Sequence, residues 1–142
     1  MEYTSLDHAR HNENTCNFLA TDLDNHNDWI ITTAFYSSMH YLRHKVFPLE
    51  INKPTGKITV NSFEEYCTEK NLYGQKHKVM RKLIEEKCDV SIASTYNQML
   101  DISFSARYNR YKYGNKIAKL AQKRLNAIKN YSLKKEKQLP FS

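Results

Sequence analysis

Residues 28–46 read DWIITTAFYSSMHYLRHKV, and this stretch decides the fold class. Its main apolar positions recur at intervals of four, four, three and four residues: Ile31, Phe35, Met39, Leu42 and Val46. This spacing places them on one face of a helix that begins at the N-cap Asp28 and ends before Pro48. Further apolar residues occupy other faces: Trp29, Ile30, Tyr36 and Tyr41. A helix that is apolar on several faces is expected at the centre of a bundle.

The same periodicity predicts helices on both sides of this one, over about residues 6–23, 63–70, 75–88, 92–111 and 116–132. Ser62 followed by Glu65 indicates a capping box before the third of the six helices. Residues 48–61 hold two of the three prolines and Gly56, and we expect a loop there. The Gly114-Asn115 pair indicates a helix stop. We therefore predict an all-α, up-and-down bundle of five to six helices.

Composition indicates one soluble domain over residues 1–132, followed by a basic, flexible tail at 133–142. The chain has 142 residues, 40% of them hydrophobic, with only three glycines and three prolines. No apolar run approaches the roughly 20 residues that a membrane span needs, and the polar first residues do not resemble a signal peptide. Three cysteines without CxxC spacing predict free thiols and a cytoplasmic location.

Positive charge gathers in the last quarter of the chain. Residues 105–142 hold eleven basic residues and one acidic residue, whereas residues 1–104 hold eleven basic and fourteen acidic ones. Such asymmetry is typical of a protein that binds a polyanion or an acidic protein partner. Solubility alone explains a basic tail equally well.

Arg107 is the first candidate for a functional side chain. On a helix over residues 92–111 it shares a face with Tyr96, Leu100 and Ser103, so a cation lies among apolar positions. A buried guanidinium needs a partner. One interpretation is an internal contact with Asp101, Asp28 or a helix-end carbonyl. The other is a phosphate-binding arginine in a cleft, because the planar guanidinium suits that oxyanion.

Two histidines are candidates for acid–base chemistry. His40 shares a helix face with Thr33, Ser37 and His44, and His77 begins the fourth predicted helix. Histidine titrates near neutral pH, so either can serve as a general acid or base if the fold brings it to Arg107. The alternative for His40 is a half-buried, hydrogen-bonded histidine, and the alternative for His77 is a packing residue at the start of its helix. No third ligand stands at a fitting spacing, so we predict no metal site.

The segment after Arg107 combines aromatic and basic residues. Lys112, Lys116, Lys119 and Lys123 fall within a narrow arc of a continuous helix, and no glutamate accompanies them. Tyr108, Arg110 and Tyr111 lie just before them. Bases can stack on such rings while cations hold phosphates. The competing interpretation is a solvated helix face beside core or dimer-contact tyrosines.

Three segments together resemble the HEPN superfamily. They read DWIITTAFYSSMHYL at residues 28–42, HKVMRKLI at 77–84 and YNQMLDISFSARYNRY at 96–111. The resemblance covers about residues 9–130. It implies a helical bundle that dimerises and, in many members, cleaves RNA without a metal in toxin–antitoxin or defence systems. The catalytic pattern there is an arginine followed four to six residues later by histidine. Arg107 fits the arginine, but residues 112–114 are Lys, Tyr and Gly, with Tyr113 at one allowed spacing.

Several functions follow as expectations. Signatures of nucleotide P-loops, Rossmann folds, serine hydrolases and zinc proteases are absent, so no cofactor is predicted. The first expectation is an RNA- or nucleotide-binding module without efficient catalysis. The second is an endoribonuclease in which His40 or His77 acts beside Arg107. The third is a protein-interaction partner, for example of a nucleotidyltransferase.

Overall fold

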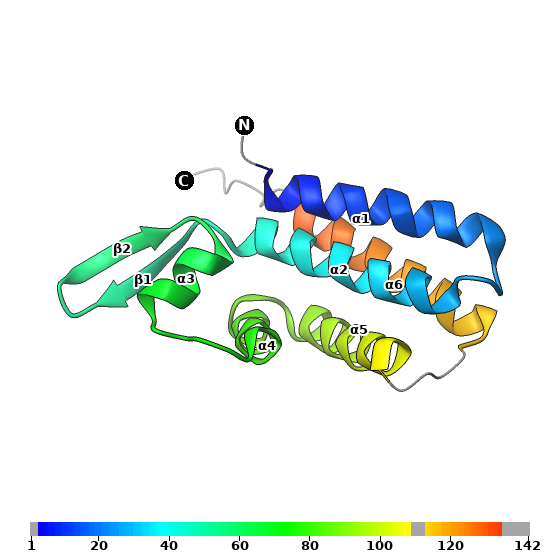
Figure 1. The fold of residues 1–142 in the computed structure, drawn as a ribbon. Coiled ribbons are helices and arrows are strands. Elements are labelled where there is room, and N and C mark those ends of the chain that lie inside the picture. The colour runs from blue at the N-terminus through cyan, green and yellow to red at the C-terminus, as the bar shows by residue number, and fades with distance from the viewer. Residues whose placement is uncertain (1–2, 109–112, 135–142) are drawn as a thin grey trace.

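The computed structural model describes residues 3–108 and 113–134 and shows an all-α bundle with one small hairpin (Figure 1). In the described residues the helices are α1 (Ser5–Leu19), α2 (Asn27–Val46), α3 (Phe63–Glu69), α4 (Lys76–Lys87), α5 (Val90–Tyr108) and α6 (Asn115–Leu133). A short 3₁₀ turn, η1 (Ala20–Asp22), follows α1. The predicted fold class is confirmed.

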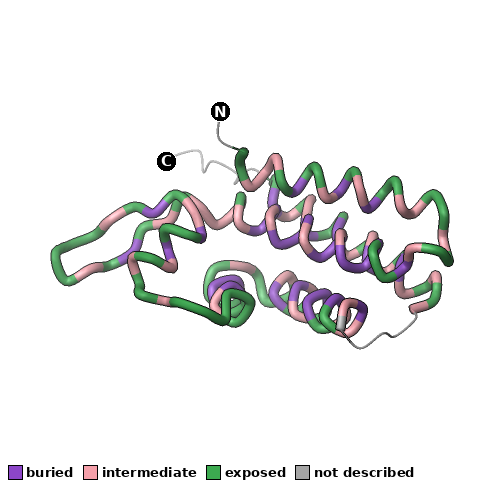
Figure 2. The backbone as a smooth tube through the Cα atoms, in the orientation of Figure 1, coloured by how far each residue is buried: buried purple, intermediate pink, exposed green. Residues whose placement is uncertain are grey.

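Helix α2 is the centre of the bundle. It packs against α1, α5 and α6, and Figure 1 shows α1 on one side of α2 and α5 on the other, with α6 behind. The predicted stripe is confirmed, since Ile31, Phe35, Met39 and Leu42 are buried and Val46 is half-buried. Burial of such side chains stabilises the fold by roughly 1.5–3 kcal/mol each. The buried residues lie where the helices face one another (Figure 2).

Small and polar side chains let α1 approach α2 closely. The Ser37 hydroxyl donates to the Ala9 carbonyl at 2.7 Å, and the Cys16 thiol donates to the Ile30 carbonyl at 3.5 Å. The Tyr41 hydroxyl donates to the Glu13 carboxylate at 2.7 Å, and Lys129 of α6 reaches the other oxygen of that carboxylate at 3.0 Å. The buried Glu13 thus joins three helices.

The loop predicted over residues 48–61 is wrong, because this segment forms a β-hairpin. Strands β1 (Leu49–Lys53) and β2 (Gly56–Val60) pair antiparallel, with Leu49 opposite Val60 and Lys53 opposite Gly56. The breakers that suggested a loop occupy the turn: Pro54 lies in it, and Gly56 takes a φ of +124°, which favours glycine. Ile51 and Val60 are the buried residues of the hairpin.

Helix ends follow the expected chemistry with three differences. Helix α2 begins at Asn27 with His26 as its N-cap and no side-chain capping bond, so the predicted N-cap Asp28 is wrong and lies inside the helix. The Ser62 hydroxyl accepts from the Glu65 backbone N–H at 3.1 Å, as an N-cap does. The Glu65 carboxylate accepts from the Asn61 N–H at 2.7 Å, one residue before the position in a capping box. Gly114 is the N-cap of α6. The tail at residues 133–142 was predicted to be flexible, and residues 135–142 of it lie outside the described residues.

Candidate functional site

One side of α2 remains partly open to solvent between α1 and the α4–α5 pair. Trp29, Tyr36, His40 and Arg43 recur at intervals of seven, four and three residues, so they share one face of the helix. We call these four residues the α2 face. Trp29 is 56% exposed, and the other three are half-buried. The start of α2 is fixed by Asn27, whose amide donates to the Tyr113 carbonyl at 2.9 Å and to the Asn115 side chain at 3.1 Å.

Arg107 of α5 lies against the α2 face. Its Nε donates to the Ser103 carbonyl at 3.3 Å, and its Nη1 donates to the Tyr36 hydroxyl. The guanidinium carbon also lies 5.2 Å from the centre of the Tyr36 ring. These contacts fix the guanidinium at the wall of a cavity of about 300 Å³ lined by Asp28, Trp29, Thr32, Ala106 and Arg107. The predicted internal partners were Asp101, Asp28 or a helix-end carbonyl, whereas the carbonyl found here belongs to Ser103, one turn back on the same helix.

This cavity, the Arg107 cavity, combines groups that suit a nucleotide. The guanidinium supplies charge and planar donors for a phosphate. The half-exposed indole of Trp29 supplies a flat surface on which a base can stack. The volume of the Arg107 cavity is at the lower end of the range that small-molecule sites have.

His77 lies near this region, at the exposed start of α4, but it does not line the Arg107 cavity. Its ring centre lies 5.9 Å from that of Phe35, the residue next to Tyr36. Burial lowers the pKa of His77, and the positive charges of Arg107 and Arg43 lower it further. The imidazole is therefore neutral at physiological pH, which is the form that can accept a proton.

His40 lies in a different cavity. Its ring stacks on that of His8, with 4.8 Å between ring centres and 22° between planes. Both rings line a cavity of about 540 Å³ with the start of α1, Arg43 and residues 61, 62 and 64. Burial lowers the pKa of His40 to about 4, with smaller contributions from the charges of Arg43 and His8. The structure thus associates His77, rather than His40, with Arg107.

Arg43 of the α2 face acts on both His40 and His77 through its positive charge. Its guanidinium carbon lies 4.4 Å from the centre of the Phe63 ring, and its Nη1 lies 3.6 Å from the exposed Glu64 carboxylate. Burial lowers the pKa of Arg43, which nonetheless stays charged at any physiological pH. Arg43 therefore adds positive charge to the α2 face near both imidazoles.

The lysines of α6 form a second surface. Lys116, Lys119 and Lys123 are exposed, as predicted, while Leu125 and Ile128 on the opposite side of α6 are buried. Since α6 packs against α2, these lysines point away from it. They are not among the residues that line the Arg107 cavity.

Part of the predicted site lies outside the described residues. Arg110, Tyr111 and Lys112 belong to the segment 109–112, which the structure does not describe. Tyr108 ends α5, and its side chain is likewise not described. These four residues remain predictions.

In residues 3–108 and 113–134, no group of three or more His, Cys, Asp or Glu side chains is placed to hold a metal ion. Within the same ranges, no helix has the length and apolar character needed to cross a membrane. Comparison of the chain with protein-family models, curated proteins and solved structures finds no match.

Sequence reasoning did not assign roles to Trp29, Tyr36 or Arg43. Trp29 and Tyr36 were interpreted only as apolar residues of the central helix, and Arg43 was not considered. Their spacing could have distinguished them from the core residues. Together with His40 they recur at intervals that place all four on one face of the helix.

Proposed function

We propose that this protein binds RNA or a nucleotide at the Arg107 cavity, as a HEPN-like module without efficient catalysis. One observation carries the proposal: the Tyr36 hydroxyl and the Ser103 carbonyl fix the Arg107 guanidinium beside an exposed indole. A phosphate would contact Arg107 and a base would stack on Trp29. The resemblance to HEPN proteins supports a homodimer and a toxin–antitoxin or defence setting as further parts of the proposal.

Trp29 makes the proposal simple to test, because it is the only tryptophan of the chain. A mononucleotide and a short single-stranded RNA are titrated into the protein while indole fluorescence is followed. We expect quenching that saturates with the wild type. Arg107→Ala should weaken binding at least about tenfold, since a charge-assisted contact to phosphate is lost.

Arg124→Ala is the matched control. Arg124 is another arginine at a helix surface, and it donates to the Gln98 side chain at 2.8 Å, not to the Arg107 cavity. The control should keep wild-type affinity. Absence of quenching at low salt, or equal affinities of the two arginine variants, would overturn the proposal and leave the protein-interaction alternative, for example with a nucleotidyltransferase.

The second candidate is an endoribonuclease, and the position of His77 favours it. A neutral imidazole near Arg107 can accept the proton of a ribose 2′-hydroxyl while the guanidinium stabilises the pentacovalent phosphate. The same RNA samples are therefore scored for cleavage. If the protein is a ribonuclease, His77→Ala and Arg107→Ala should both abolish cleavage. His40→Ala should not, because His40 lines another cavity.

A further inference from the structure

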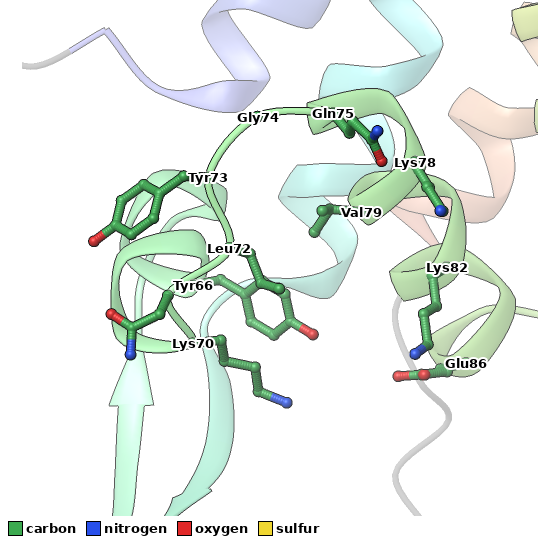
Figure 3. A pocket seen from close by; sticks show the side chains of 11 residues that line it. Tyr66, Lys70, Leu72, Tyr73, Gly74, Gln75, Lys78, Val79, Lys82 and Glu86 are labelled. Carbon is green, nitrogen blue, oxygen red and sulfur yellow. The ribbon is translucent and has the colours of Figure 1, made fainter.

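A third cavity lies between α4 and the turn at residues 70–75 that leads into this helix. Its volume is about 480 Å³. Figure 3 shows that one wall comes from α3 and the turn at residues 70–75, and the other from α4. We call it the α3–α4 pocket. It shares no lining residue with the Arg107 cavity or with the cavity that His8 and His40 line.

The pocket is positively charged. Three lysines line it, Lys70, Lys78 and Lys82, against a single carboxylate, Glu86. The lining therefore carries two more positive charges than negative ones. In Figure 3 the ends of Lys70 and Lys82 extend toward the space between the turn and α4. This excess matches a phosphate monoester, whose charge at neutral pH is about −1.5 to −2.

The pocket also has an apolar part. Tyr66 is buried with 7% of its surface exposed, and the half-buried Leu72 and Val79 lie beside it. The ammonium group of Lys70 lies 5.2 Å from the centre of the Tyr66 ring. Burial raises the pKa of the Tyr66 phenol, so its hydroxyl stays protonated and can donate a hydrogen bond. A ligand in this pocket would therefore contact lysine ammonium groups and the ring of Tyr66 at the same time.

The start of α4 adds to the preference for an anion. The N-cap residue Gln75 makes no side-chain capping bond, and the first turn of the helix contains no acidic residue. Lys76 and Lys78 stand there instead, although the positive end of a helix disfavours cations. An anion in the pocket would offset the charge of Lys78, which lines the pocket and stands at this unfavourable end of the helix.

We infer that the α3–α4 pocket binds a small phosphate monoester with an aromatic or apolar group. The phosphate lies between Lys70 and Lys82, and the apolar group lies on Tyr66, Leu72 and Val79. Neither carboxylates nor free phosphate match the site as well. A carboxylate carries one charge for two unbalanced lysines, and free phosphate leaves the apolar surface uncovered.

Phenyl phosphate is a suitable probe because it has only these two parts. It is titrated into the full chain, and backbone amide shifts of Leu72, Gly74 and Val79 are followed by NMR. We expect saturable shifts with the wild type. Lys70→Gln and Lys82→Gln should each weaken binding about tenfold, the usual cost of one charge-assisted contact. Glu86→Gln should tighten binding, because the only acidic side chain of the lining is neutralised.

Lys87→Gln is the matched control, since Lys87 is an exposed lysine of the same helix outside the pocket. It should bind as the wild type does. The inference is overturned if phenyl phosphate gives no saturable shifts, or if Lys82→Gln behaves like Lys87→Gln. It is equally overturned if benzoate, phenol or inorganic phosphate binds as tightly as phenyl phosphate. All positions changed are exposed, and the remaining amide signals report directly on whether each variant is folded.

This inference is independent of the proposed function. Arg107→Ala should leave the binding of phenyl phosphate in the α3–α4 pocket unchanged. Lys82→Gln should leave the quenching of Trp29 by a mononucleotide unchanged. Failure of one experiment therefore does not imply failure of the other.

Discussion

At the scale of single residues, His40 shows how burial changes a side chain's chemistry. Its imidazole stacks on His8 and lies near Arg43, and its pKa falls to about 4. Its usual value is about 6.5. Between these two pH values the unfolded chain binds a proton that the folded protein does not bind. The free energy of unfolding must therefore decrease as the pH falls through this window.

We predict that this decrease amounts to at most about 3 kcal/mol from His40 alone. His40→Gln should lose correspondingly less stability than the wild type between about pH 7 and pH 4.5. Urea unfolding at both pH values measures the difference. His11→Gln, at an exposed position of α1, should keep the pH dependence of the wild type. A His40→Gln variant with the same pH dependence as the wild type would show that the imidazole is already solvated.

Arg107 shows how much of the candidate site can be predicted from the sequence alone. Residues 96–107 predict a cation on an apolar helix face, with an internal contact and a phosphate site as the two alternatives. The structure shows that the contact partners are Ser103, on its own helix, and Tyr36, 71 residues away. No local pattern specifies a partner so distant in the chain, because only the packing of α5 on α2 brings the two together.

At the scale of helices, Glu13 links α1, α2 and α6 through Tyr41 and Lys129. Desolvation and the contact with Glu13 raise the pKa of the Tyr41 phenol, so Tyr41 remains a hydrogen-bond donor. Removing one member of a buried, charged group leaves the others without a partner. The stability of the fold should therefore be sensitive to substitution of Glu13. In the sequence, this carboxylate is visible only as an interruption of the apolar pattern between Ala9 and Cys16.

We predict that Glu13→Ala lowers the free energy of unfolding by about 3 kcal/mol. Glu13→Gln should lose less, because an amide oxygen can still accept from Tyr41. Asn14→Ala, at an exposed neighbouring position, should change stability little. Denaturant titration of the three variants measures these differences. A loss in Glu13→Ala no larger than in Asn14→Ala would contradict the proposed link between the helices.

The helices were predictable and the hairpin was not, for a physical reason. A helix repeats its apolar spacing over several turns, so α2 and α6 could be located closely from residues 28–46 and 116–132. Each strand of the hairpin has only five residues, and Ile51 and Val60 alone are buried in it. Two buried positions are too few to define an alternation against the proline and glycine nearby.

At the scale of the whole molecule, the basic residues separate into distinct surfaces. The lysines of α6 point away from α2, whereas Arg107 lies against Tyr36 on the α2 face. None of these lysines lines the Arg107 cavity, so a mononucleotide bound there does not depend on them. A longer RNA can contact both surfaces.

We therefore predict that replacing Lys116, Lys119 and Lys123 together by Gln leaves mononucleotide binding unchanged. For a long single-stranded RNA the dependence of affinity on salt should become shallower, by about two in the log–log slope if all three lysines contact phosphates. Affinities measured over a salt series give the slope. An unchanged slope would show that the α6 lysines are a solvated surface only.

The central position of α2 also affects how the chain can fold while it is being made. The residues that close the bundle around α2 come from α1, which is synthesised before it, and from α5 and α6, of which α6 begins only at Asn115. Everything from Phe47 to Gly114 must leave the ribosome before α6 can cover its side of α2. During that interval, apolar surface of α2 stays uncovered, as expected of a nascent chain that needs chaperone protection. Stalling synthesis just before residue 115 should give a chain that proteases degrade readily, and release after residue 134 should give a resistant one.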